Sequence, residues 1–156
     1  MALFLNIKRK RNRMNIVGPI ILVDDDHDDH EIIKSICENL GVCQYLKFFD
    51  NGFDLVSYLK TSGETPFLIL CDINMPHING MALRKLISED AFLKRKSIPF
   101  IFFSTAATPD QVKEAYEDLT VQGFFIKGNT FQDTERRFKN ILQYWSDCKH
   151  PNSIQN

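Results

Sequence analysis

Five short and nearly continuous apolar runs alternate along the chain with segments whose apolar residues recur at helical spacing. The apolar runs occupy residues 20–23, 45–49, 67–71, 98–103 and 124–126, and the helical patterns occupy residues 32–40, 55–59, 81–88, 109–119 and 131–145. Such runs indicate strands that are buried on both faces, because a strand with one solvent face alternates apolar and polar residues. The pattern therefore predicts an α/β protein of the (βα)5 type with a five-stranded parallel sheet.

The connections of such a sheet restrict its topology. Crossovers between parallel strands are right-handed, and helices on both faces favour a doubly wound sheet in the order 2-1-3-4-5. The length of 156 residues suits one domain. Ligands of doubly wound sheets bind outside the carboxyl ends of the strands. We therefore expect the functional residues in the loops that follow the strands.

The residues that follow the strands are mostly acidic. Carboxylates come after the first and third strands, hydroxyls after the fourth and a lysine after the fifth: Asp24, Asp25, Asp26, Asp72, Ser104, Thr105 and Lys127. Clustered carboxylates repel one another unless a cation joins them. Their oxygens suit Mg²⁺, and a lysine supplies positive charge for a phosphoryl oxygen. The set predicts a phosphoryl-transfer site, in which a carboxylate can itself accept the group as an aspartyl phosphate.

Four segments carry a resemblance to a known family. They are residues 21–26 (Ile-Leu-Val-Asp-Asp-Asp), residues 70–76 (Leu-Cys-Asp-Ile-Asn-Met-Pro) with Gly80 four residues on, residues 100–104 and residues 124–127. In this order on successive strands they resemble the receiver domain of two-component response regulators, over residues 18–146. The resemblance implies a stand-alone receiver with a flavodoxin-like fold, and the strand order 2-1-3-4-5 is itself partly implied by it.

The resemblance also assigns roles at the acidic edge. It implies that Asp72 is the phosphoacceptor and a ligand of Mg²⁺. Asp25 would bind the ion directly and Asp24 mainly through water. The backbone carbonyl of Asn74 would be a further ligand.

The resemblance implies a switch as well. Lys127 would pair with Asp72 and then with its phosphoryl group, and Ser104 would hydrogen-bond a phosphoryl oxygen. Phe124 occupies the aromatic switch position of the family, and its rotamer would follow the movement of the loop after Ser104. Partners would contact a face formed by residues 109–119, 124–126 and 131–145. Whether phosphorylation also drives homodimer formation stays open.

One position departs from the family pattern. Gly128 stands where the family usually has a proline after a cis peptide bond. Because a cis bond before a residue other than proline costs about 3 kcal/mol, we expect a trans peptide between Lys127 and Gly128, or a freer loop. The loop after the last strand therefore need not follow the family's geometry.

Other polar residues near the first strand have ordinary interpretations. Asp26 is expected to be a bystander, and Asp28 and Asp29 a solvated helix start, because acids are favourable at a helix N-terminus. His27 and His30 are three residues apart, a spacing that can indicate zinc. Because no third soft ligand accompanies them, we expect both to be surface residues.

The two ends of the chain differ from its middle. Residues 1–17 carry five basic side chains and no acidic one, although the net charge of the whole chain is −1. We interpret this arm as a disordered leader, or as sequence upstream of a start at Met14. Contact with nucleic acid is the weaker alternative, because no recognition element accompanies the arm. Residues 147–156 are expected to form a polar tail.

Cysteines and hydropathy bear on location. No apolar run approaches the roughly 20 residues of a membrane span, and no secretory signal is recognisable. The cysteines contain no Cys-x-x-Cys pair, so we expect reduced thiols in a cytoplasm and no zinc site of that kind. They are Cys37, Cys43, Cys71 and Cys148.

Three functions fit these observations to different degrees. The first is a receiver that accepts a phosphoryl group onto Asp72 from a histidine kinase or a histidine phosphotransfer protein and thereby switches partner binding; such a protein is not an enzyme. The second is an adaptor that is never phosphorylated, which Gly128 motivates. The third is a phosphatase of the haloacid dehalogenase type. That class needs Asp-x-Asp on its first strand, whereas Asp72 follows the third predicted strand.

Overall fold

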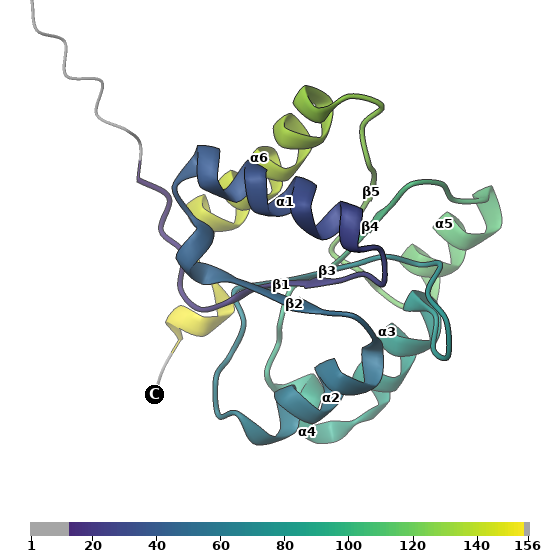
Figure 1. The fold of residues 1–156 in the computed structure, drawn as a ribbon. Helices are drawn as coiled ribbons and strands as arrows, with labels where there is room; N and C mark the ends of the chain where they lie inside the picture. Colours follow the sequence, from purple (N-terminus) through teal and green to yellow (C-terminus); the bar gives the residue numbers. More distant parts are fainter. Residues whose placement is uncertain (1–12, 155–156) are drawn as a thin grey trace, which may run out of the picture.

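The computed structural model describes residues 13–154 and contains one parallel sheet. Its strands are β1 (Ile20–Val23), β2 (Leu46–Phe49), β3 (Leu68–Cys71), β4 (Phe100–Ser104) and β5 (Gly123–Ile126). They pair in the order β2-β1-β3-β4-β5, which confirms the predicted fold class and strand order (Figure 1). The fourth strand begins two residues later than the predicted run at residues 98–103.

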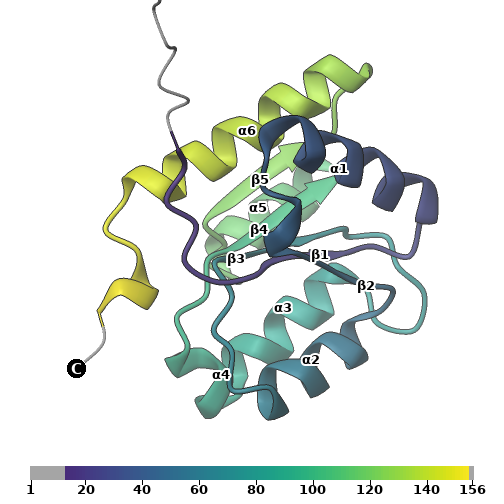
Figure 2. The same ribbon diagram turned by 60° about the vertical axis from the view of Figure 1, so that its left-hand side comes forward.

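Helices connect the strands and cover both faces of the sheet (Figures 1 and 2). They are α1 (His27–Leu40), α2 (Gly52–Thr61), α3 (Gly80–Glu89), α4 (Ala91–Arg95), α5 (Pro109–Glu117) and α6 (Phe131–Asp147), with short 3₁₀ helices η1 (Cys43–Tyr45) and η2 (Pro151–Ser153). No helix in the described part of the chain is long and apolar enough to span a membrane.

Alternation along the strands divides the core into two halves. Ile20 and Leu22 of β1 pack with residues of α1 and α6, whereas Ile21 and Val23 pack with residues of α2, α3, α4 and α5. All four β1 side chains are buried, as a central strand covered on both faces requires. The sheet is therefore fixed from both sides, and this holds the loops at the carboxyl ends of its strands.

Helix α4 corrects one detail of the sequence prediction. The apolar pattern predicts no element between residues 88 and 98, but residues 91–95 form this five-residue helix, with Lys94 and Arg95 in its last turn. Asp90 caps it by accepting hydrogen bonds from the backbone N–H groups of Phe92 and Leu93, each at 3.0 Å. Leu93 is buried against the core. One apolar residue in a segment this short gives no helical period for a sequence pattern to detect.

The packed part of the chain is longer than the 18–146 predicted from the sequence. On the N-terminal side Ile16 is buried in the core half beneath α1 and α6. On the C-terminal side the buried ring of His150 stacks on Phe67 and donates from Nε2 to the Phe67 carbonyl at 2.6 Å. Asn152 donates to the backbone carbonyls of residues 17, 65 and 66. The segment after α6 thus folds back to the amino ends of the strands (Figure 2). Most of the basic arm, residues 1–12, lies outside the described residues.

Candidate functional site

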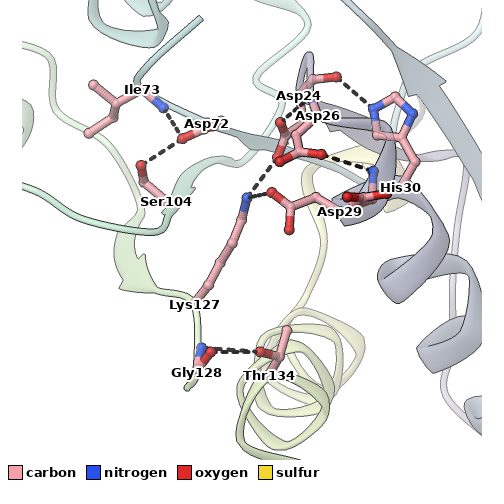
Figure 3. Close-up of polar contacts among 11 residues, drawn as sticks. Asp24, Asp26, Asp29, His30, Asp72, Ile73, Ser104, Lys127, Gly128 and Thr134 are labelled. Carbon is pink, nitrogen blue, oxygen red and sulfur yellow. Dashed lines mark hydrogen bonds and ion pairs between the residues drawn. The ribbon is translucent and has the colours of Figure 1, made fainter. Parts of the chain in front are cut away.

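Polar residues meet at the carboxyl ends of the strands, as the sequence predicts. Asp24 follows β1, Asp72 follows β3, Ser104 ends β4 and Lys127 follows β5, and all four are buried (Figure 3). Backbone hydrogen bonds continue past the strand ends: the N–H of Asp24 donates to Phe49, that of Asp72 to Val23 and that of Lys127 to Ser104, at 2.8–3.1 Å. The sheet itself therefore positions these side chains.

One oxygen of the Asp72 carboxylate is held by two donors. The Ser104 hydroxyl donates to Oδ1 at 2.6 Å, and the backbone N–H of Ile73 donates to the same atom at 2.8 Å. No described residue donates a hydrogen bond to Oδ2. The residue is 8% exposed, so this second oxygen belongs to a carboxylate that is fixed in place and still reached by solvent. Ser104 thus contacts Asp72 itself, and its hydrogen bond to a phosphoryl oxygen stays a prediction.

Gly80 allows the loop after Asp72 to close tightly. Its backbone N–H donates to the carbonyl of Ile73 at 2.9 Å, where α3 begins. A Cβ at this position would lie 2.3 Å from the carbonyl oxygen of Asp72, which is far inside van der Waals contact. The glycine in the motif of residues 70–80 is therefore a packing requirement of the loop that carries the Asp72 carboxylate.

Asp24 is completely buried and has two partners. Its Oδ1 accepts the backbone N–H of Asp26 at 2.9 Å, and its Oδ2 lies 2.7 Å from Nζ of Lys127. Burial raises the pKa of Asp24 to about 6, against the lowering effect of these two partners. A buried carboxylate with such a pKa is one that a further positive charge would stabilise in its ionised form.

Lys127 does not pair with Asp72 as expected. Its ammonium group binds the carboxylates of Asp24 and Asp29 instead, each at 2.7 Å (Figure 3). Burial lowers the pKa of Lys127, but the hydrogen bonds and charges of the two carboxylates raise it by more, so that it lies above its usual value. The lysine is thus a fully charged bridge between the end of β1 and the first turn of α1.

Sequence reasoning missed Asp29 as a member of this site. It was expected to be solvated, but its side chain is only 22% exposed and faces Lys127. The available signal was its place in the first turn of the helix that follows Asp24, since that turn lies directly over the strand end. Asp26 is the N-cap of α1 and accepts the backbone N–H of Asp28 at 2.9 Å, so its role is to start this helix.

His30 also differs from expectation. It is 9% exposed rather than a surface residue, its Nε2 lies 2.6 Å from the carbonyl oxygen of Asp24, and its ring stacks on Phe48. His27 is exposed, as predicted. The backbone of Asp24 is therefore supported by His30, while its side chain is held by Lys127.

Three carboxylates are close enough to share a cation. One oxygen from each of Asp24, Asp25 and Asp72 lies within 4.8 Å of the others, and Asp25 is exposed at the mouth of the site. An all-oxygen donor set with one solvent-facing member fits Mg²⁺, which binds through one or two carboxylates and keeps several waters. Asn74 is exposed in the loop after Asp72. The role of its backbone carbonyl as a ligand remains a prediction.

Comparison with known proteins agrees with this arrangement. The family model described as the response regulator receiver domain matches residues 20–139. The chain belongs to this family. Receiver domains are signalling domains of two-component systems, and the haloacid dehalogenase alternative is therefore set aside.

Two curated relatives show how far the similarity of this receiver domain extends. Response regulator Rcp1 of Synechocystis sp. is 27% identical over 131 residues, which cover 81% of this chain and 87% of Rcp1. Chemotaxis protein CheY1 of Helicobacter pylori is 28% identical over 123 residues, which cover 79% of this chain and 95% of CheY1. Both relatives thus consist of little besides the region that matches this receiver domain.

Solved structures confirm the fold. The phosphorylated cyanobacterial phytochrome response regulator RcpA has a TM-score of 0.74 and 27% identity, covering 83% of this chain and 94% of RcpA. The Mn²⁺-bound form of Rcp1 has a TM-score of 0.71 at 24% identity, covering 84% of this chain and 96% of that structure. At 24% sequence identity, the similarity to the Mn²⁺-bound form of Rcp1 is evidence for the fold only.

The departure of this receiver domain at Gly128 has a structural reason. Every peptide bond of the described residues is trans, including the bond before Gly128. The N–H of Gly128 donates to the Thr134 hydroxyl at 3.1 Å (Figure 3), a bond that proline would remove. A Cβ here would lie 2.3 Å from Cβ of Asp133. The last strand is therefore joined to α6 by a close backbone contact for which glycine is required.

Phe124 of β5 contacts the neighbouring strand β4. Its ring is partly buried and packs on Phe102 of β4, with ring centroids 5.5 Å apart. It thus contacts the strand that ends in Ser104. Its role as a switch remains a prediction.

Proposed function

We propose that this receiver domain accepts a phosphoryl group onto Asp72 from a phosphohistidine of a histidine kinase or a histidine phosphotransfer protein. The observation that carries the proposal is the asymmetry of the Asp72 carboxylate: Oδ1 is held by Ser104 and Ile73, and Oδ2 accepts no hydrogen bond from a described residue. Oδ2 is therefore the oxygen that attacks. A P–O bond forms as the P–N bond of the donor breaks, and the departing imidazole takes up a proton from solvent.

We propose Mg²⁺ as the cation of this reaction, held by Asp24, Asp25 and Asp72. A bound divalent cation supplies positive charge that neutralises the phosphoryl oxygens. The Mn²⁺-bound form of Rcp1 supports a divalent cation in this fold. Asp24 and Asp72 are buried and positioned by the sheet, so they need little reorganisation to bind one.

The lysine bridge supports a switch between two states. In the unmodified protein Lys127 is occupied by Asp24 and Asp29. A phosphoryl group on Asp72 adds about two negative charges beside it and offers the lysine a new partner. Each charge-assisted hydrogen bond gained at the phosphoryl oxygens, from Lys127 or Ser104, contributes about 1.5–3 kcal/mol. Because Lys127 and Ser104 give up contacts with Asp24, Asp29 or Asp72 as they turn, the shift depends on the bonds gained less the bonds lost, against the roughly 5.5 kcal/mol that inverts a strongly biased two-state equilibrium.

The output of the switch is partner binding at the face of α5, β5 and α6. Four large apolar side chains are exposed on these three elements. They are Tyr116 on α5, Ile126 at the end of β5, and Phe131 and Tyr144 on α6. Phe124 connects this face to the strand that carries Ser104, through its contact with Phe102. We place the reaction in the cytoplasm, where thiols such as that of Cys71 stay reduced.

The pairing of Lys127 gives one specific reason to keep the adaptor as a second candidate. A lysine that stays bound to Asp24 and Asp29 would not assist phosphorylation of Asp72. The two functions predict opposite results when the protein meets a small phosphoryl donor.

The test is intact-mass measurement after incubation with acetyl phosphate and Mg²⁺. We expect an adduct of about 80 Da that hydroxylamine removes, because an acyl phosphate is cleaved by this nucleophile. Asp72→Ala should carry no adduct, and Asp28→Asn is the matched control, since Asp28 is an acidic residue outside the cluster. If the unmodified sequence shows no adduct at any Mg²⁺ concentration, the adaptor is the correct function.

A further inference from the structure

A second group of potential metal ligands lies beside the acidic site. His27 and His30 come from the first turn of α1, and Asp50 follows β2. One ligand atom from each lies within 4.8 Å of the other two. Nε2 of His27 is 3.3 Å and Nδ1 of His30 is 3.9 Å from Oδ1 of Asp50, and no hydrogen bond joins the three side chains. Asp50 is the third ligand that the sequence spacing of the two histidines could not reveal.

His30 is oriented as a metal ligand would be. Its Nε2 lies 2.6 Å from the backbone carbonyl oxygen of Asp24, which can only accept, so Nε2 carries the proton (Figure 3). In the neutral ring this leaves the lone pair on Nδ1, the atom that faces Asp50. The side chain is 11% exposed and its ring is stacked on Phe48, with centroids 4.6 Å apart. Ligating histidines commonly donate their other N–H to a backbone carbonyl in this way, which fixes the tautomer and the ring.

The two exposed residues, His27 and Asp50, can move to complete a tetrahedral coordination geometry. In tetrahedral zinc sites ligand distances of about 2.0–2.1 Å place neighbouring ligand atoms about 3.3–3.4 Å apart. The contact between His27 and Asp50 already has this length, and the contact of His30 is longer. The His27 and His30 rings are nearly parallel, so His27 must turn to direct its lone pair at a shared ion. Its side chain is 77% exposed and free to do so.

We propose that His27, His30 and Asp50 form a binding site for a divalent transition metal ion, of which zinc is the representative. Two imidazoles and one carboxylate are the three protein ligands typical of zinc sites that keep an open position for water. Mg²⁺ prefers oxygen ligands and is not expected here. The site differs in chemistry from the carboxylate cluster and does not depend on phosphorylation of Asp72. A bound ion would tie the start of α1 to the loop after β2, next to the backbone of Asp24.

The test is a zinc titration of the full chain in excess Mg²⁺, followed by the imidazole NMR signals of ¹⁵N-labelled histidine. We expect the signals of His27 and His30 to shift together, with His30 coordinated through Nδ1, and those of His77 and His150 to stay in place. Calorimetry under the same conditions measures the affinity. We expect His27→Ala and Asp50→Asn to weaken zinc binding at least about tenfold, because each removes one of three ligands.

Two control variants keep the result interpretable. Glu31→Gln changes an exposed acid on the same turn of α1, and His77→Ala removes an imidazole outside the group. Both should bind zinc as the unmodified protein does. His30→Ala is avoided because it removes the support of the Asp24 carbonyl and thus perturbs the fold. Unchanged affinity in His27→Ala and Asp50→Asn, or zinc-dependent shifts confined to other residues, would overturn the proposal.

Discussion

Replacing Lys127 with methionine removes the one cation that the described structure places against the buried carboxylate of Asp24. The two groups are 2.7 Å apart, and their side chains are 8% and 0% exposed, so solvent does not screen the pair. Methionine keeps the length of the side chain and its apolar stem. The variant therefore tests the charge with little change in packing.

The cost of this change follows from the environment of Asp24. Removing one partner of a buried ion pair typically destabilises a protein by about 3–5 kcal/mol, because the other charge is left uncompensated. Asp24 keeps the N–H of Asp26, and burial already raises its pKa to about 6, so that proton uptake near neutral pH limits the loss. We therefore expect the free energy of unfolding at pH 7 to fall by about 3 kcal/mol, the lower end of that range.

Urea unfolding with and without Mg²⁺ measures this prediction. Without divalent cations Lys127→Met should show the full loss. A cation that binds the folded state alone stabilises it by about 2.7 kcal/mol at a hundredfold excess over its Kd. We expect this stabilisation at lower Mg²⁺ concentrations in the variant than in the unmodified protein, since the lysine no longer competes for Asp24.

Two further variants decide what a result means. Lys34→Met changes an exposed lysine of α1 that makes no ion pair with a described residue, and it should cost little. Asp24→Asn combined with Lys127→Met should be more stable than Lys127→Met alone, because no buried charge is then left unpaired. A loss below about 1 kcal/mol for Lys127→Met, or a double variant that is less stable still, would refute the reasoning.

Three other perturbations test separate parts of the structure. Gly128→Ala should lower the free energy of unfolding by about 1–3 kcal/mol in chemical denaturation, because the added Cβ meets Asp133; an unchanged midpoint would show that the loop yields freely. Ser104→Ala should cost about 1–2 kcal/mol by the same measurement, since Asp72 loses a buried hydrogen bond, and Ser104→Thr should recover part of it; equal losses in both variants would contradict this reason. Burial lowers the pKa of His150 below its usual 6.5, so the unfolded chain binds this proton first as the pH falls. The contribution of His150 to the free energy of unfolding should therefore be fully present above about pH 6.5 and decline below it. In urea unfolding across pH 5–8, His150→Gln should reduce that decline, and an identical pH profile would count against His150 as its source.

The sequence predicts the fold and the main site residues for a common physical reason. Parallel strands end at one edge of a sheet, so the residues that follow successive strands must meet there. Asp24, Asp72, Ser104 and Lys127 were found by this rule alone, and the structure buries all four at that edge. Elements with clear apolar patterns were predicted in the same way.

Contacts between particular side chains could not be predicted. Lys127 has several carboxylates within reach, and its choice of Asp29 over Asp72 depends on how the first turn of α1 lies over the sheet edge. A one-dimensional pattern contains no information about that placement. The same limit hid the burial of His30, which depends on a hydrogen bond to the Asp24 carbonyl and on stacking against β2.

Polarity misled the prediction for the C-terminal segment. A run of polar residues is typical of a solvated tail, but His150 and Asn152 bury their side chains against backbone carbonyls at the amino ends of the strands. Those carbonyls belong to residues far away in the sequence. Polar residues of this kind act as packing residues only once the fold has created acceptors for them.

The most direct test of the central claim is chemical identification of the phosphorylated residue. After incubation with acetyl phosphate and Mg²⁺, borohydride reduction converts an aspartyl phosphate into homoserine, which peptide mass spectrometry locates. We predict homoserine at position 72 and at no other aspartate, because among the residues that the structure describes only Asp72 combines an Oδ1 held by two donors, an Oδ2 that accepts no hydrogen bond and a place in the carboxylate cluster. Homoserine at Asp24 or Asp25, or none at all, would contradict the account.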